Sequence, residues 1–295
     1  LNNTLIGHGT SYRLTTGDNN TNIGVSAGWG NHTGSDNTYV GKDAGLGASD
    51  NANSDNVGVG SNALLAVTTG STNVAIGKSA AVALTTGDSN ITIGTNTLGV
   101  ATSAEDVVLI GASAGYAINN DAADGTVAVG RSALAALTTG AGNVAIGYTA
   151  MNDVVEGANN TALGYNAFGG ALDATADAST NNIFIGHNAG SGDWVTAVSN
   201  YNVAIGGNSM DAAMNGALNN TALGYNAAST ITTGDTNICI GAHAGNHDIN
   251  LTTGTHNTLV GAYSDVSATG ATNQTAIGHD CSGVADNSVT LGNAS

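Results

Sequence analysis

A five-residue phrase recurs along the entire chain and constrains its fold more than any other feature. The sequence NVAIG at 73–77 returns as NITIG at 90–94, seventeen residues later. Counted by its closing glycine, the phrase occurs seventeen times in 295 residues, and nine of the sixteen successive intervals are 17 residues long. A short, fixed period over a whole chain is the signature of a solenoid. We therefore expect one continuous repeat domain over residues 1–295.

The phrase alternates between two kinds of side chain. Numbered from Asn73 as position 1 to Gly77 as position 5, it has Asn at position 1 in thirteen of seventeen copies. Position 2 is Val, Ile or Thr, position 4 is Ile, Val or Leu, and position 3 ranges from Gly58 to Tyr39 and Phe184. A period of two is typical of a β-strand. We expect positions 2 and 4 to point into a dry core, positions 1 and 3 to point outward, and successive Asn residues to stack in a hydrogen-bonded ladder.

The rest of the repeat is small or typical of turns. Position 8 is Ala, Ser, Thr or Cys in every copy, and Thr-Thr-Gly closes six copies. We expect the glycine at position 5 to end the strand where a side chain would collide. A second strand of small residues should follow, and then a turn with positive φ at the Thr-Thr-Gly glycine. Cys239 and Cys281 occupy positions that hold small residues in other copies, so we expect both to be buried.

These patterns predict an all-β fold, a single parallel β-solenoid of about seventeen turns with about seventeen residues in each. Successive strands would lie about 4.8 Å apart. The composition agrees with this fold, since the chain has 44 Gly, no Pro, 4% aromatic and 8% charged residues. Large side chains are too few for an ordinary globular core, and Pro and charged residues are too few for a disordered chain.

The charge balance excludes two classes of partner. The formal net charge is −17, with only four Lys and Arg residues. Such a surface cannot neutralise phosphates, so we expect neither nucleic-acid binding nor attraction to anionic lipid. The sequence also contains no run of 18 apolar residues, so we expect no membrane insertion.

The phrase Asn-x-Ala-Ile-Gly, followed two residues later by a small residue, occurs at 73–80, 143–150 and 202–209. It resembles the head repeat of trimeric autotransporter adhesins of the YadA type, and equally the similar arrays of bacteriophage tail fibres. The resemblance covers essentially the whole chain as a short, degenerate motif, and the period here is longer than the head repeat of that family. It implies a left-handed parallel β-roll, assembled as a homotrimer in an extracellular attachment fibre. A virion fibre and a bacterial cell surface both stay open as its location.

The expected assembly also has support from two rows of small residues. Position 3 is Ala in seven of the seventeen copies, and position 8 is small throughout. Such rows would let subunits pack along their length, so we expect a homotrimer. End-to-end stacking into a filament is the alternative, because neither terminus shows a capping element. Since the sequence begins without Met and stops within a repeat, we expect a segment of a longer fibre.

The residues able to do chemistry are scattered. The four cations are spread over eight repeats, and the acidic residues lie mainly in loops. We therefore expect a non-enzymatic structural and adhesive fibre. The alternative is a carbohydrate-active enzyme or a ligand-binding β-helix, which would need paired carboxylates or a basic group on neighbouring turns.

The sequence predicts no cofactor and no metal site. Neither an EF-hand loop nor a repeat-in-toxin pattern is present. Thr-Thr-Gly-Asp occurs three times, ending at Asp18, Asp88 and Asp235. We interpret these segments first as turns, and calcium bound in the loops is the alternative.

Position 6 is the first candidate ligand-binding column. It holds three of the four cations together with Tyr148, Tyr165 and Tyr225, so we expect it to be exposed to solvent. Tyr rings suit the faces of sugars, and surface carbohydrate or a receptor is the partner that we expect. The competing interpretation is an exposed ladder that tolerates many residues.

Insertions in the repeat indicate a second candidate ligand-binding site. The three intervals between Gly164 and Gly224 are 22, 20 and 18 residues long, and loops that leave a solenoid often carry binding sites. The inserted loops lie at 169–181 and 190–201, and the second contains Trp194 and Tyr201. We predict these two residues as ligand contacts. The competing interpretation is that Trp194 covers apolar surface beneath its own loop or fills a subunit seam.

Overall fold

The chain folds as a parallel β-solenoid, as predicted. The structure is a computed structural model that describes residues 2–119, 123–172 and 176–292. The structure divides into two compact units, unit 1 (1–143) and unit 2 (144–295). Unit 1 contains the strands β1 (Thr4–Ile6), β2 (Thr21–Ile23), β3 (Thr38–Val40), β4 (Val57–Val59), β5 (Val74–Ile76), β6 (Ile91–Ile93), β7 (Val108–Ile110) and β8 (Val127–Val129).

Unit 2 contains nine strands among its described residues. They are β9 (Val144–Ile146), β10 (Thr161–Leu163), β11 (Ile183–Ile185), β12 (Val203–Ile205), β13 (Thr221–Leu223), β14 (Ile238–Ile240), β15 (Thr258–Val260), β16 (Thr275–Ile277) and β17 (Val289–Leu291). Unit 2 also contains a 3-10 turn, η2 (Ala176–Ala178). The chain is therefore all-β.

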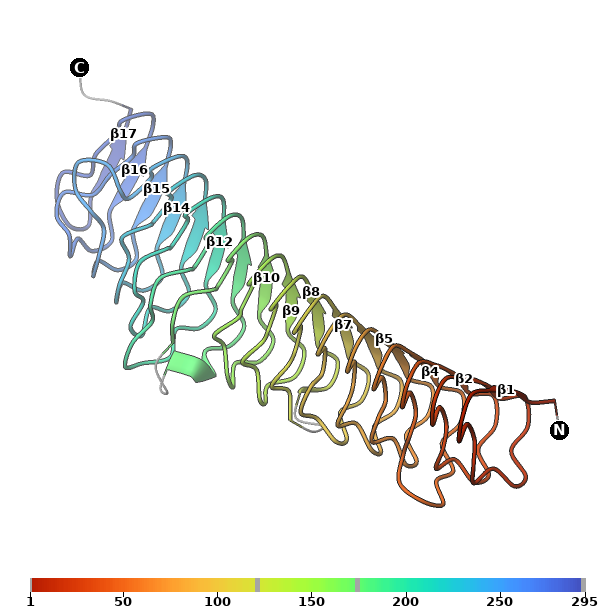
Figure 1. Cartoon of the computed structure of the whole chain (residues 1–295). Helices are drawn as coiled ribbons and strands as arrows, with labels where there is room; N and C mark the ends of the chain where they lie inside the picture. Colours follow the sequence, from red (N-terminus) through yellow and green to blue (C-terminus); the bar gives the residue numbers. More distant parts are fainter. Residues whose placement is uncertain (1, 120–122, 173–175, 293–295) are drawn as a thin grey trace. The chain divides into compact units, whose positions relative to one another are not determined.

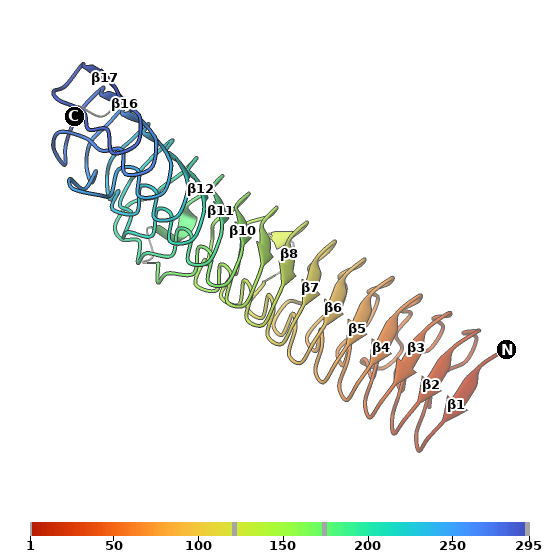
Figure 2. The same ribbon diagram turned by 90° about the horizontal axis from the view of Figure 1, so that it is seen from above.

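Within each unit, each strand pairs in parallel with the strand of the next turn, and equivalent positions of the repeat lie side by side. Val74 of β5 is paired with Val57 of β4 and with Ile91 of β6. In unit 2, Val203 of β12 is likewise paired with Ile183 and Thr221. Figure 1 shows the strands of each unit following one another along one side of the coil, and the perpendicular view in Figure 2 shows the same order. The phrase recurs because each copy lies on the previous one.

The direction of the strand side chains is opposite to our expectation. Between the first and last strands position 3 is buried, with Ala75, Ala145 and Phe184 fully inaccessible to solvent, and the Asn residues of position 1 after the first turn are buried as well. Positions 2 and 4 point outward, so that 37% of Ile76 and 46% of Leu223 is exposed. The prediction placed the most hydrophobic residues inside. It was wrong because the inner side of this strand carries a ladder of amides.

The Asn ladder itself is confirmed, and it explains how a polar residue is accommodated in the core. The Oδ1 of Asn73 accepts hydrogen bonds from the backbone N–H of Asn90 at 3.0 Å and from its Nδ2 at 2.9 Å. The Nδ2 of Asn73 in turn donates to the carbonyl of Gly87 at 2.8 Å and to Oδ1 of Asn56 at 3.1 Å. Unit 2 repeats the pattern, for example between Asn220 and Asn202. Buried amides cost little when every donor and acceptor is paired in this way.

Position 3 varies in size because neighbouring inner positions compensate for it. Tyr39 is fully buried, and its hydroxyl donates to Oδ1 of Asn53 at 2.6 Å. The next strand has Gly58 opposite Tyr39, and a Cβ on Gly58 would lie 2.8 Å from the Tyr39 ring. Burial raises the pKa of the Tyr39 phenol well above its usual range. The large Tyr39 ring thus fits because Gly58, its neighbour in the next turn, has no side chain.

The glycine of position 5 is required by both conformation and space, as expected. Gly77 has a φ of +135°, and a Cβ there would lie 2.6 Å from the carbonyl oxygen of Gly94. Position 8 is also buried, as in Ala80 and Ala150, and the buried thiols of Cys239 and Cys281 agree with the prediction for them.

Two expectations about the turns were wrong. The residues after position 5 form turns rather than a second strand, and positions 7 and 9 have left-handed backbone, as in Ser79 (φ 55°) and Ala81 (φ 48°). The glycine of Thr-Thr-Gly is needed mostly for space rather than for positive φ, since a Cβ on Gly87 would lie 2.0 Å from the carbonyl oxygen of Ala104. Alternating left-handed residues bend the backbone sharply, so position 9 also points inward.

Candidate binding surfaces

The outward side of the sheet carries a row of exposed apolar residues within each unit. Positions 2 and 4 carry only Val, Ile, Leu and Thr, and no copy has a charged residue at either position. In-register pairing places each of these side chains beside its equivalents in the turns before and after, as Ile205 lies beside Ile185 and Leu223. The result is a continuous apolar face in each unit, which we call the outer sheet face.

The outer sheet face replaces the rows of small residues as the candidate surface for subunit packing. Positions 3 and 8 line the interior of the coil, so neither row can meet another subunit. Outward side chains in a ladder still cover one another, which is why 36% of Ile205 remains exposed. Their alignment leaves a surface of nearly uniform height, suited to packing against another flat surface.

A second surface in unit 2 is an aromatic column that follows the glycine of position 5. Tyr148 stacks on Tyr165 with ring centroids 5.4 Å apart and an interplanar angle of 8°. Tyr165 stacks in the same way on His187 at 5.2 Å and 13°. About half of Tyr165 is exposed. The expectation that position 6 is open to solvent is therefore confirmed for this column.

The column resumes beyond a gap and is longer than the sequence suggested. Gly207 holds position 6 between His187 and Tyr225, and no ring fills that place. Tyr225 then contacts His243 at 5.4 Å and 77°, and His243 stacks on Tyr263 at 5.4 Å and 9°. Further ring contacts to Tyr263 come from His247 at 4.8 Å and His279 at 5.6 Å. We name the whole set, from Tyr148 to His279, the aromatic column.

The sequence analysis did not assign His243 and Tyr263 to this column, because they occupy position 7 of the repeat rather than position 6. A shift of one residue places a ring in the same column, since the turn after position 5 curls back on itself. Their spacing of 20 residues matches the interval between Gly241 and Gly261, and that match was the available signal.

The structure does not bring Trp194 to the ligand-accessible surface. Its side chain is fully buried, with ring centroids 4.6 Å from Phe168 and 5.7 Å from Phe184. The prediction of a ligand contact is therefore corrected: the indole fills the core with the only two Phe residues of the chain. Tyr201 is 57% exposed, and it stays a candidate contact. Residues 173–175 of the first inserted loop lie outside the described residues.

The titratable groups with shifted pKa values are all perturbed mainly by burial. Burial raises the pKa of the carboxyl groups of Asp153 and Asp211, and for Asp153 the nearby charge of Asp193 adds to the rise. Burial also raises the pKa of the Cys239 thiol to about 12. A raised carboxyl pKa suits a general acid, so Asp153 and Asp211 are the residues on which the enzymatic alternative would depend.

Asp265 is a buried carboxylate inside the coil. It accepts backbone hydrogen bonds from Asp248 at 2.7 Å, from Ile249 at 2.8 Å and from Val266 at 3.2 Å. Burial raises its pKa more than these bonds and nearby His247 lower it. The carboxylate thus fixes the turn around Asp248 from within.

The aspartates at the ends of the Thr-Thr-Gly-Asp segments take part in turn structure. The carboxylate of Asp88 accepts the backbone N–H of Ser71 at 2.5 Å, and that of Asp235 accepts the N–H of Leu218 at 2.7 Å. Within 2–119, 123–172 and 176–292, no three His, Cys, Asp or Glu side chains gather in a way that could hold a metal ion. The described residues also form no helix of the length and hydrophobicity needed to cross a membrane.

Comparison with known proteins adds no family assignment. No protein-family model matches the chain, and no curated protein is similar to it at a significant level. The function therefore has to be argued from the surfaces described above.

Proposed function

We propose that this protein is a non-enzymatic structural and adhesive fibre segment, in which copies of the chain associate side by side through their outer sheet faces. The observation that carries this proposal is the continuous apolar face on the outside of a coil whose core is already filled. Val, Ile and Leu residues there contribute little to the interior of their own chain. Association with another copy of the chain would bury these side chains and so stabilise the assembly.

The size of the face supports association. With strands about 4.8 Å apart and three residues wide, the nine strands of unit 2 present an apolar face of roughly 400 Å². This matches the largest apolar patch of a typical monomer, about 300–600 Å², and such a patch is often an interaction site. Burying about 400 Å² contributes roughly 10 kcal/mol before the cost of association is subtracted.

The charge distribution favours another copy over a different kind of partner. A chain with a net charge of −17 repels other copies of itself, and charged side chains at the contact would strengthen that repulsion. Positions 2 and 4 carry none. A repeated face also complements itself at every turn, because equivalent residues recur at the spacing of the strands. The number of three subunits, the left hand and an extracellular location on a virion or a bacterial surface come from the family resemblance.

The adhesive part of the proposal depends on the aromatic column. Tyr148, Tyr165 and Tyr225 are each about half exposed along unit 2, and Tyr165 is stacked on both faces, by Tyr148 and by His187. The column therefore presents ring edges and hydroxyl groups, which can pack against a sugar and hydrogen-bond to it. In a fibre that associates through its outer sheet faces, we expect the column to stay open for a surface carbohydrate or a receptor.

The mass of the purified chain in solution tests the structural part. Sedimentation equilibrium at micromolar concentration should give three times the chain mass of 28.6 kDa. A stable monomer would refute side-by-side association, and a mass that rises without limit with concentration would favour the end-to-end filament.

The enzymatic alternative has its own test. The purified protein should not release reducing sugar from a panel of polysaccharides. Turnover that Asp153→Asn or Asp211→Asn abolishes would reverse the ranking of the two functions, because those carboxyl groups have the raised pKa that acid catalysis needs.

A further inference from the structure

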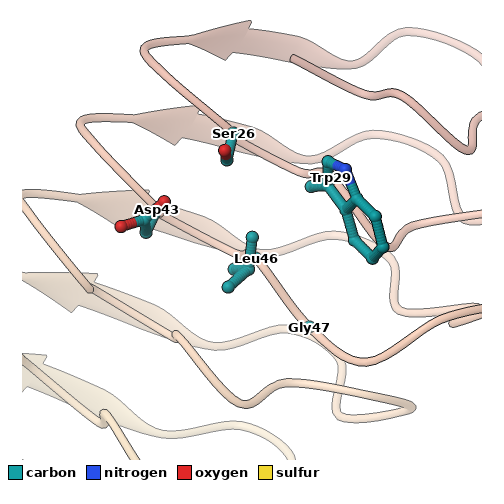
Figure 3. A pocket seen from close by; sticks show the side chains of 5 residues that line it. All are labelled: Ser26, Trp29, Asp43, Leu46 and Gly47. Atoms are coloured by element: carbon teal, nitrogen blue, oxygen red, sulfur yellow. The ribbon is translucent and has the colours of Figure 1, made fainter. Parts of the chain in front are cut away.

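Unit 1 contains a pocket that lies apart from the aromatic column and from the outer sheet face. It lies between the turn that follows β2 and the turn that follows β3, and it has a volume of about 340 Å³. Ser26 and Trp29 line it from the first turn, and Asp43, Leu46 and Gly47 from the second (Figure 3). A pocket of this volume lies at the small end of the range for small-molecule sites.

The indole of Trp29 is held in place by the turn before it. Tyr12 stacks on it with ring centroids 6.1 Å apart and an interplanar angle of 7°. The guanidinium of Arg13 lies 4.9 Å from the ring centroid, a cation–π contact, and Asp50 pairs with Arg13 at 3.6 Å. Tyr12 and Arg13 come from the turn before Trp29, whereas Asp50, Leu46 and Gly47 come from the turn after it. The indole is therefore fixed from one side and lines the pocket from the other.

The opposite wall of the pocket is polar. Figure 3 shows Ser26 and Asp43 on the side nearer the strands, with the indole of Trp29 across from them. Ser26 and Asp43 occupy the same position of the repeat in successive turns, which places a hydroxyl next to a carboxylate. Lys42 lies 3.4 Å from the Asp43 carboxylate and reaches it from solvent. The pocket thus has an aromatic wall facing a donor–acceptor pair.

We propose that this pocket binds a neutral sugar residue of a polysaccharide or glycan. The C–H face of a pyranose would pack on the indole of Trp29 and against Leu46, and its hydroxyl groups would donate to Asp43 and exchange hydrogen bonds with Ser26. The carboxylate and the net charge of the chain exclude acidic sugars by repulsion. This inference deepens the adhesive part of the proposed function, on which it rests, and places a second carbohydrate site in unit 1.

The two tryptophans of the chain provide a direct readout. Trp29 lines the pocket, whereas Trp194 is fully buried. Cello-, malto-, manno- and galacto-oligosaccharides titrated into the full chain should change the tryptophan emission for at least one series, with a Kd of about 1 mM. Sulfated and uronic oligosaccharides should leave the emission unchanged.

Two variants assign the signal to the pocket. Trp29→Phe keeps a ring against Tyr12 and Arg13 but should abolish the emission change, while Trp194 continues to report an intact core. Asp43→Asn keeps a residue that accepts the left-handed backbone at this position (φ 57°). It should weaken binding about tenfold, because a charged acceptor is replaced by a neutral one.

Tyr116→Ala is the matched control. Tyr116 occupies the same position of the repeat as Trp29, in the turn that follows β7, and it is 45% exposed but lies outside the pocket. Its removal should leave the affinity unchanged. Absence of binding for all four neutral series up to about 10 mM, binding of acidic sugars instead, or equal affinity in Asp43→Asn would each overturn the proposal. Sedimentation of the same samples separates this result from the fibre proposal, because a monomer that binds sugar would refute only the latter.

Discussion

The inward and outward sides of the strands carry opposite kinds of variation. On the inward side, position 3 changes from Gly58 to Tyr39 in adjacent strands, and each change is matched by its neighbours. On the outward side, positions 2 and 4 carry only Val, Ile, Leu and Thr over seventeen copies. The side chains in the core need not be equal in size, because a large residue in one turn can be offset by a small residue in the next. A uniform face indicates a partner that is itself periodic, and another copy of this chain meets that condition.

We expect the largest difference in stability between two alanine variants of unit 2, one that removes a buried aromatic ring and one that removes an exposed ring. Trp194→Ala should lower the free energy of unfolding by about 3–5 kcal/mol, because it leaves a cavity against Phe168 and Phe184. Tyr165→Ala should lower it by less than about 1 kcal/mol, since only exposed stacking is lost. Chemical denaturation of the two variants measures both values. Equal losses would show that the aromatic column is part of the core.

The Asn ladder should give the next largest effect. Asn73→Ala removes the acceptor for Asn90 and the donor to Gly87 in a buried site, so we expect a loss of about 2–4 kcal/mol. The exposed Thr69→Ala in the preceding turn is the matched control, and it should change stability by less than about 0.5 kcal/mol. Urea unfolding curves provide the comparison. A neutral Asn73→Ala would mean that the ladder follows the fold without stabilising it.

The smallest effect concerns pH and the buried Asp265. Its pKa is raised in the folded state, so the folded protein binds the proton more tightly than the unfolded chain does. Stability from this group is present below the unfolded pKa of about 4 and is lost as the pH rises through the raised folded value. Thermal unfolding between pH 4 and 7 should therefore show a decline that is weaker in Asp265→Asn. A stability that rises equally with pH in both proteins would contradict the assignment.

Much of the fold could be predicted from the period alone. The recurring Gly of position 5 and the Asn of position 1 indicated stacked turns, in-register pairing and an amide ladder, because only stacking requires the same residue at the same place in each turn. The phase of the alternation could not be predicted from hydrophobicity. Val74 and Ile76 point outward and Asn73 inward, and the reason is hydrogen bonding between turns, which the sequence of one turn does not contain.

The candidate sites were only partly visible in the sequence. Tyr148, Tyr165 and Tyr225 share a repeat position, so their exposure could be predicted. Trp194 lies in an insertion without a repeat position, and its partners are Phe184 of its own turn and Phe168 of the turn before, so its burial could not be foreseen. The pocket at Trp29 joins three repeat positions across two turns, and such a combination emerges only when the stacking is known.

The mass in solution of paired lysine variants, measured by sedimentation equilibrium, tests most directly whether the chains associate through their outer sheet faces. Ile76→Lys and Ile205→Lys place charges on the outer sheet face, whereas Thr69→Lys and Thr233→Lys place them on exposed turns of the same two units. If the chains associate through their outer sheet faces, the double face variant should dissociate to 28.6 kDa with little change in circular dichroism. The double turn variant should keep the mass of the unmodified assembly. An unmodified protein that is already a monomer, or a face variant that stays assembled, would contradict association through these faces.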